Sequence, residues 1–293
     1  MKSKPWLVYA LVTVAFWGVW GAFAGLPTEH GFPDTMVYVV WALTMLPPML
    51  VALQLVRWRL QLDRRSIYLG SMIGFTGAGG QMLLFHAVHT GPTYLIFPVI
   101  ALSPVVTIGL SVLMLRERVS RVVAAGIVVA LVALPMFDYD PAGRLGGHGM
   151  EWFVDALFIM LAWGLQAFYI KLAHRTMNAE NIFFYMTVTG LLLVPVALWM
   201  TDFSQPINYG WQGPGLAAIT QILNSVGVLT LVYAFRQGKA IVVSPLVNAG
   251  APLVTSVISL AWLGIMPLPL KCVALVLALL SAALLAIEPE EAA

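Results

Sequence analysis

The sequence predicts an all-α integral membrane protein with ten transmembrane helices, arranged as two inverted five-helix repeats. Of its 293 residues, 60% are hydrophobic and only 10% are charged, whereas soluble domains carry about 25% charged residues because their surfaces face water. Apolar runs of about 20 residues, the length that crosses a bilayer as a helix, recur along the whole chain. The two halves also match each other at a nearly constant distance. This composition excludes soluble enzymes, nucleic-acid-binding proteins and disordered proteins.

Ten apolar runs, separated by charged residues, proline and glycine, are the expected spans. In order they are Trp6–Leu26, Thr35–Val56, Ile67–His89, Thr93–Leu115, Arg121–Phe137, Trp152–Leu172, Ile182–Met200, Gly215–Phe235, Ala240–Leu263 and Leu268–Ile287. Helices are expected because a strand of a membrane barrel alternates polar and apolar residues. The first span follows Lys2 and Lys4 as a signal peptide would. We nevertheless expect a structural helix, because the run is longer than a signal core and is repeated in the second half.

Lysine and arginine predict the orientation, because cytoplasmic loops are enriched in these residues. With the N-terminus inside, alternating spans leave only Arg144 and Lys271 of the 15 basic residues on the outer side. The opposite orientation would invert this ratio. We therefore expect a multi-pass protein of the cell inner membrane with both termini in the cytoplasm and the lipid bilayer as its surroundings.

Matched motifs indicate that the second half repeats the first. The first and sixth spans share a Trp-Gly pair, at Trp17-Gly18 and at Trp163-Gly164, an offset of 146 residues (163 − 17). The fourth and ninth spans share a proline, Pro98 and Pro245, at an offset of 147 (245 − 98). Matched Trp-Gly pairs and prolines are far less frequent by chance than matched apolar residues.

Five spans per repeat is an odd number, so the second repeat enters the membrane from the opposite side. This inverted topology is typical of secondary transporters, whose substrate site lies near the midplane between the repeats. The expected division is an N-terminal repeat over residues 1–138, an extracytoplasmic linker over 139–149 and a C-terminal repeat over 150–293.

Together these features resemble the EamA-type permeases of the drug/metabolite transporter superfamily. The resemblance covers almost the whole chain and includes a fourth-helix pattern that runs from Gly91 through Pro104 and Thr107 to Glu117. One position departs from it, since Ile265 stands where the second repeat would repeat Glu117, and a glutamate-dependent role of that loop is not expected twice. The resemblance implies a carrier of small metabolites that rocks between inward-open and outward-open states and is often an exporter.

Amide side chains near the middle of the spans are candidates for substrate contact, because polar groups inside the hydrocarbon layer are costly and often functional. The candidates of this kind are Gln81, Gln166, Gln221, Asn224 and Asn248. The alternative role is hydrogen bonding between neighbouring helices, which would hold the bundle together.

The amides of the eighth span have glycines as their repeat counterparts. Gln221 and Asn224 share one helix face, and the equivalent positions of the third span are Gly74 and Gly77. One repeat therefore offers amides where the other offers bare backbone and room. We expect an asymmetric pocket.

Aromatic side chains are the second group of substrate-binding candidates. Trp17 and Trp163 occupy equivalent mid-depth positions, away from the interfacial belt where tryptophan usually collects, and Trp20 lies one turn further along. These rings, with Tyr94, could stack on an aromatic or cationic substrate. The alternative is that Trp-Gly is a helix-packing element of the fold.

Prolines and titratable groups supply the remaining candidates. Pro98 and Pro245 lie inside spans, where each frees a backbone carbonyl and can act as a hinge. His86 and His89, one turn apart near the outer end of the third span, are candidates for polar lining or for a proton relay. Asp155, about one turn inside the outer face, is a candidate gate or cation attractor. No metal site or cofactor is expected, because no ligand cluster has the required spacing.

The expected function is secondary transport of a small neutral or zwitterionic metabolite by a monomer. A hydrophobic or aromatic amino acid fits the amides and rings best, and export is the expected direction. A carrier of drug-like or quaternary ammonium cations, held in an aromatic cage, is the first alternative. An intramembrane enzyme or lipid flippase is more remote, since a catalytic set of side chains is missing from the sequence, and a non-transporting scaffold would not need polar groups at the midplane.

Overall fold

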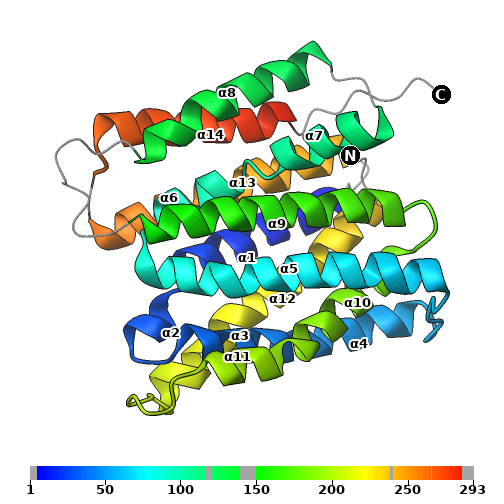
Figure 1. The fold of residues 1–293 in the computed structure, drawn as a ribbon, viewed down its shortest axis with the longest axis horizontal. Coiled ribbons are helices and arrows are strands. Elements are labelled where there is room, and N and C mark those ends of the chain that lie inside the picture. Colours follow the sequence, from blue (N-terminus) through cyan, green and yellow to red (C-terminus); the bar gives the residue numbers. More distant parts are fainter. Residues whose placement is uncertain (1–4, 117–119, 139–149, 238–239, 265, 286–293) are drawn as a thin grey trace.

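The computed structural model describes residues 5–116, 120–138, 150–237, 240–264 and 266–285, and every regular element in these ranges is a helix (Figure 1). The helices of the first half are α1 (Pro5–Phe23), α2 (Leu26–Glu29), α3 (Asp34–Thr44), α4 (Leu46–Leu55), α5 (Arg64–Thr90), α6 (Thr93–Ile100), α7 (Pro104–Leu115) and α8 (Arg121–Asp138). Those of the second half are α9 (Glu151–Ala173), α10 (Ala179–Leu192), α11 (Val194–Met200), the π-helical turn η1 (Trp211–Gly215), α12 (Leu216–Gln237), α13 (Ala240–Leu263) and α14 (Pro269–Leu285).

Three of the expected spans are each divided into two helices, which the apolar pattern alone did not predict. The second span breaks at Met45 between α3 and α4, and the seventh breaks at Leu193 between α10 and α11. The fourth span breaks after Ile100, and α7 begins at Pro104. In each case a proline occupies the first turn of the second helix. Proline lacks an N–H group and is tolerated at the first turn of a helix but not in its interior, which explains the position of these breaks.

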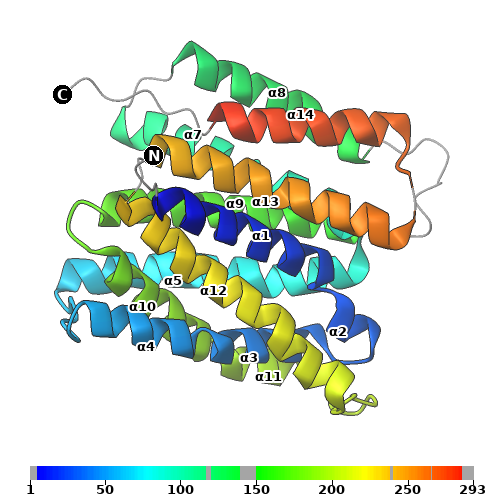
Figure 2. The same ribbon diagram turned by 180° about the vertical axis from the view of Figure 1, so that it is seen from behind.

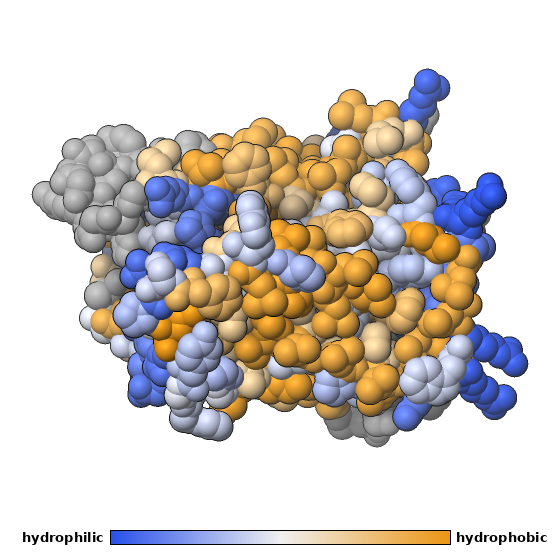
Figure 3. Space-filling view, turned by 60° about the horizontal axis from the view of Figure 1, so that its bottom comes forward, coloured by the Kyte–Doolittle hydropathy of each residue, from blue (hydrophilic) through white to orange (hydrophobic). Residues whose placement is uncertain are grey.

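Length and composition make this a membrane protein. Six helical segments of the described chain are long and apolar enough to cross a bilayer, and they are Trp6–Glu29, Asp34–Leu55, Thr93–Leu115, Glu151–Ala173, Ala179–Met200 and Trp211–Leu231. Shorter apolar helices cover Arg121–Ala133, Ala249–Leu263 and Pro269–Leu284. Figure 3 shows the corresponding surface on one face, where a hydrophobic band separates two hydrophilic ends. The count of ten spans stays a prediction.

The first helix of each repeat packs among helices of the other repeat. Helix α1 contacts α12 and α13, and its counterpart α9 contacts α5, α6 and α7. Helices α8 and α14 pair along one edge of the bundle, and α3 and α4 pack against α10 and α11 along the opposite edge (Figures 1 and 2). The two repeats are thus interlocked about an approximate twofold axis.

The two ends of the bundle differ in charge. One end, called the basic end here, lies where α1 begins, α4 meets α5 and α9 meets α10, and it carries the exposed Arg57, Arg59, Arg64, Arg65 and Arg175. The opposite end, called the acidic end, carries Glu29, Asp34, Glu151, Asp155 and Asp202. Among the described basic residues, Lys271 at the start of α14 is the one that is buried. In the predicted orientation, the basic end faces the cytoplasm.

Candidate substrate path

The two tryptophans of the Trp-Gly motifs join the repeats by equivalent hydrogen bonds. On α1, Trp17 Nε1 donates to the backbone oxygen of Asn224 on α12 at 3.1 Å. On α9, Trp163 Nε1 donates to the backbone oxygen of Gly77 on α5 at 3.3 Å. Positions 77 and 224 are themselves 147 residues apart (224 − 77). The contact is therefore repeated about the approximate twofold axis.

Glycines make room for both indole rings. A Cβ atom at Gly227 would lie 2.4 Å from the Trp17 ring, and one at Gly80 would lie 2.5 Å from Nε1 of Trp163. Such distances are too short for packed atoms, so any side chain at these glycines would displace a tryptophan. The geometry supports the helix-packing role of Trp17 and Trp163, with both rings half-buried.

The glycines of the Trp-Gly motifs receive a second matched contact. Thr107 Oγ1 donates to the backbone oxygen of Gly164 at 2.9 Å, and Thr255 Oγ1 donates to that of Gly18 at 3.1 Å. A threonine hydroxyl can bond a backbone oxygen of a neighbouring helix only where the two helices approach closely. Glycine permits this approach because it has no side chain. These four residues hold α7 to α9 and α13 to α1.

One turn beyond the Trp-Gly motifs the two repeats differ. In the first repeat, Trp20 Nε1 donates to Oε1 of the buried Gln221 at 2.9 Å. The counterpart of Trp20 is Gln166, whose Nε2 donates to the backbone oxygen of Ile73 at 3.2 Å. The Gln166 side chain also fills the space beside Gly77, where a Cβ would lie 2.0 Å from its Nε2. The room expected at this glycine is thus occupied by an amide from the other repeat.

A tryptophan that the sequence analysis did not single out completes this layer. Trp41 of α3 donates from Nε1 to Oδ1 of Asn224 at 3.0 Å, and both side chains are buried. Trp20 meets Phe97 of α6 edge-on, with ring centroids 5.5 Å apart. Amide oxygens of the second repeat therefore accept the indole N–H groups of the first.

Gln81 differs from the other amides in having an unsatisfied donor. Its side chain is 4% exposed, and its Nε2 has no hydrogen-bond partner among the described residues. It lies on α5 one turn beyond Gly77, between the level of the Trp-Gly contacts and the acidic end. A buried donor left unpaired costs about 1–3 kcal/mol, so this group is the strongest candidate for a ligand contact.

Pro98 leaves one backbone oxygen of α6 without its helical donor, and a serine of the other repeat bonds to that oxygen. Proline removes the N–H that would bond the backbone oxygen four residues earlier, which belongs to Tyr94. Ser256 Oγ of α13 donates to that oxygen at 3.3 Å. The helix then ends at Ile100, so Pro98 lies just before the break between α6 and α7. The side chains of Pro245 and Asn248 lie outside the described residues, although their backbone belongs to the unbroken helix α13.

A cavity of about 510 Å³ opens at the acidic end beside this region. Helix α1, the start of α6 and the loop between α13 and α14 contribute to its wall, which includes Tyr94, His89, Trp262 and Lys271. The Lys271 side chain is 1% exposed, and its Nζ donates to the backbone oxygen of Met136 at 3.3 Å. Of the residues singled out from the sequence as candidates, the cavity includes Tyr94 and His89.

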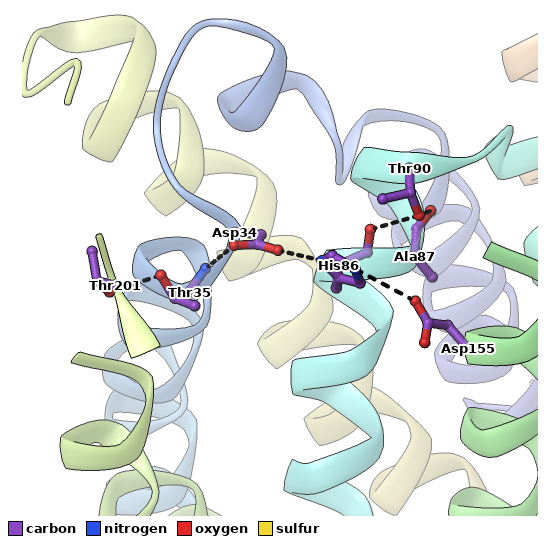
Figure 4. Close-up of polar contacts among 7 residues, drawn as sticks. All are labelled: Asp34, Thr35, His86, Ala87, Thr90, Asp155 and Thr201. Carbon is purple, nitrogen blue, oxygen red and sulfur yellow. Dashed lines mark hydrogen bonds and ion pairs between the residues drawn. The ribbon is translucent and has the colours of Figure 1, made fainter. Parts of the chain in front are cut away.

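At the acidic end, one histidine stands between two carboxylates (Figure 4). His86 Nδ1 of α5 lies 3.0 Å from Oδ2 of Asp34, the first residue of α3. His86 Nε2 lies 3.8 Å from Oδ2 of Asp155 on α9. The imidazole is 49% exposed, and the carboxylates are 22% and 17% exposed. The described residues contain no group of three or more such side chains arranged to hold a metal ion.

Aspartates outside the spans serve local structure. Asp63 caps α5 and accepts hydrogen bonds from the backbone N and the Oγ of Ser66, which lower the pKa of its carboxyl group. Asp202, in the loop after α11, accepts equivalent bonds from Ser204, and its pKa is lowered for the same reason. Neither carboxylate contacts the residues of the path described above.

Inverted repeats that interlock near the middle of the bundle are typical of secondary transporters. The model of the EamA-like transporter family matches the chain twice, over residues 4–137 and 151–287. The chain belongs to the EamA-like transporter family of the drug/metabolite transporter superfamily and is a membrane transporter.

One solved crystal structure aligns over 97% of this chain and 96% of its own, with a TM-score of 0.63 and 14% sequence identity. At that identity the likeness shows the fold alone. No curated protein matches the chain.

Three predicted candidates, Trp20, Gln221 and Asn224, take part in the hydrogen bonds of this layer. Of the others, Tyr94 lines the cavity at the acidic end, and His86 contacts Asp34 and Asp155. Two residues with contacts to these candidates were not predicted from the sequence: Trp41, which bonds Asn224, and Asp34, which faces His86. The sequence contains a signal for both, because residues 34, 38, 41 and 45 have the spacing of one helix face.

Proposed function

We propose that this transporter moves a small neutral or zwitterionic metabolite across the inner membrane by alternating access, and that the substrate is a hydrophobic or aromatic amino acid carried outward. It acts as a monomer, with both termini in the cytoplasm. The observation that carries the proposal is the unpaired, buried Nε2 of Gln81. Such a donor fits the carboxylate of an amino acid, which is an acceptor only.

The rings of the amide layer favour an apolar or aromatic substrate side chain. The indole N–H groups of Trp20 and Trp41 are engaged by Gln221 and Asn224, so only the carbon faces of these rings could contact a substrate. Phe97 adds a third ring next to Trp20. Aromatic rings prefer edge-to-face or offset contacts with other rings and contribute about 0.5–1.5 kcal/mol per pair beyond area burial.

The test is thermal unfolding of the purified protein with and without amino acids, nucleosides, sugars and quaternary amines. A ligand at about one hundred times its Kd stabilises the folded state by about 2.7 kcal/mol. We expect hydrophobic and aromatic amino acids to raise Tm and the other compounds to leave it unchanged.

The variant Gln81→Leu separates a binding amide from a structural one. Removing an unpaired buried donor is expected to stabilise the ligand-free protein by about 1–3 kcal/mol, while the shift caused by amino acids is lost. The matched control is Gln221→Leu, which strands the Trp20 N–H and is expected to destabilise the ligand-free protein. A Gln81→Leu protein that still responds to amino acids contradicts the role of Gln81. Stabilisation by quaternary amines alone would instead favour a cation carrier with an aromatic cage.

A further inference from the structure

The imidazole of His86 makes one hydrogen bond and one longer ion-pair contact, each to a different carboxylate. Asp34 Oδ2 lies at 3.0 Å from one ring nitrogen and Asp155 Oδ2 at 3.8 Å from the other. An ionised carboxylate only accepts hydrogen bonds, and a neutral imidazole has one N–H donor and one acceptor nitrogen. Both nitrogens are donors in the imidazolium form alone, and only that form carries a positive charge that attracts both carboxylates. A bound proton would therefore strengthen the bridge seen in Figure 4.

The two contacts of His86 join different pairs of helices, which are held together to different degrees. Helices α5 and α9 are joined along their length by the Trp163 and Gln166 hydrogen bonds, and near the acidic end Gly91 lies against the ring of Trp152. His86 and Asp155 thus belong to one fixed pair of helices. Asp34 reaches His86 from α3, which lies on the other side of α5 from α9 in Figure 4. The contact from His86 to Asp34 is the one through which a bound proton can strengthen the attachment of α3 to this pair.

The equivalent position at the basic end has no such group. At the offsets of the two repeats, His86 corresponds to Tyr233 (86 + 147) and Asp155 corresponds to Tyr9 (155 − 146). The rings of Tyr9 and Tyr233 contact each other with centroids 5.4 Å apart. The same structural position therefore carries an imidazole and a carboxylate at one end of the molecule and two phenol rings at the other.

Other titratable groups surround the bridge, and a pH response must be assigned against them. They are Glu151 one turn before Asp155 on α9, His89 one turn after His86 on α5, Glu29 and His30 on α2, and Asp202 after α11. Of these, His89 and His30 are the other imidazoles. Neither is within ion-pair distance of a carboxylate among the described residues, so His89 serves as the control.

We propose that His86 is a proton-binding site of the carrier, and that a proton taken up from the solution at the acidic end bridges Asp34 to Asp155 and closes α3 onto the α5–α9 pair. This inference rests on the proposed alternating access, but not on the identity of the substrate. Loss of the proton leaves a neutral ring with a single N–H, which can still donate to Asp34, but it removes the positive charge that attracts both carboxylates. Helix α3 is then held less tightly against the α5–α9 pair.

The test measures the distance between α9 and the α2–α3 connection as a function of pH, without any substrate. Spin labels are placed at Met150→Cys and His30→Cys, both exposed positions, in a Cys272→Ser background so that the single native cysteine is absent. In liposomes we expect a shorter distance at pH 5.5 than at pH 8. We expect His86→Gln to abolish this shift and Asp34→Asn to reduce it, while His89→Gln retains it. Asp34→Asn preserves side-chain size, so its effect reports charge.

A pH shift that survives in His86→Gln would overturn the inference, and so would a parent protein whose distance is the same at both pH values. Each variant is first compared with the parent by size-exclusion elution and Tm, and amino-acid binding is measured separately by thermal shift. If the bridge responds to pH but no amino acid binds, the substrate proposal fails and the proton site stands. If amino acids bind but the distance ignores pH, the reverse holds.

Discussion

The two ends of the bundle are closed by side chains at the same position of the repeat, but the bonds that they make differ. At the basic end, Gln61 donates from Nε2 to the backbone oxygen of Thr176 at 2.9 Å and accepts from the backbone N of Asn178 at 3.0 Å. At the acidic end its counterpart is Asn208 (61 + 147), which donates from Nδ2 to the backbone oxygen of His30 at 2.8 Å. Each residue hydrogen-bonds to a loop of the opposite repeat, and this contact is called the clasp here.

The basic end adds further neutral hydrogen bonds to its clasp. Asn181, which is fully buried, accepts from the backbone N of Gln61 at 2.9 Å and donates to the backbone oxygen of Arg59 at 3.1 Å. Tyr185 donates to the backbone oxygen of Gln61 at 2.7 Å. The position equivalent to Asn181 at the acidic end is Asp34 (181 − 147), the carboxylate that faces His86.

The difference teaches how an inverted repeat acquires direction. Its backbone provides two equivalent ends, one facing each side of the membrane. Here the basic end is held by neutral hydrogen bonds of Gln61 and Asn181, whereas the acidic end combines a smaller clasp with the His86 bridge between two carboxylates. If His86 binds a proton as proposed, the proton acts on a contact between helices that the basic end lacks.

The largest expected effect is at the basic end. Asn181→Ala strands the backbone N–H of Gln61 and the backbone oxygen of Arg59, so we expect a loss of about 2 kcal/mol in unfolding free energy. The matched change at the other end, Asn208→Ala, is expected to cost about 1 kcal/mol because its site is more exposed. Thermal unfolding in one detergent measures both. An Asn208→Ala protein that is the less stable of the two would reverse the comparison.

A smaller effect follows from building the basic-end contact at the acidic end. In the double variant His86→Tyr with Asp155→Tyr, a ring pair worth about 0.5–1.5 kcal/mol replaces the charge bridge. We expect stability near that of the parent at pH 6 and the same distance between spin labels at pH 5.5 and pH 8. A retained pH shift would show that the groups controlling this end lie elsewhere.

The smallest effect concerns Asp63, the cap of α5 at the basic end. Hydrogen bonds from Ser66 lower the pKa of its carboxyl group in the folded state. Its contribution to stability is therefore complete above the unfolded value of about 4 and is lost as the pH falls through the lower folded-state value. Asp63→Ala should lower Tm at pH 7, and the difference from the parent should shrink as the pH is lowered below about 4. A difference that stays constant as the pH falls would contradict the charged cap.

Several features of the path were accessible from the pattern of residues. The Trp-Gly pairs at Trp17 and Trp163 were recognised as equivalent, and the alternative that they are packing elements is the one their contacts support. The asymmetry around Gln221 was also predicted, but the space expected at Gly77 is filled by Gln166. The sequence shows that a residue is small, but it does not show which distant side chain fills the space beside it.

Composition and periodicity by themselves determined that this chain forms membrane helices in two related halves, because burial in hydrocarbon constrains every residue of a span and a repeat leaves matched motifs. Only the tertiary structure decided which polar groups are satisfied. Trp20 and Gln221 are bonded although 201 residues separate them, whereas the Nε2 of Gln81 is left unpaired and His86 meets carboxylates from two other helices. Such pairings depend on the rotation and tilt of each helix against its neighbours, and these are set by packing across the whole bundle.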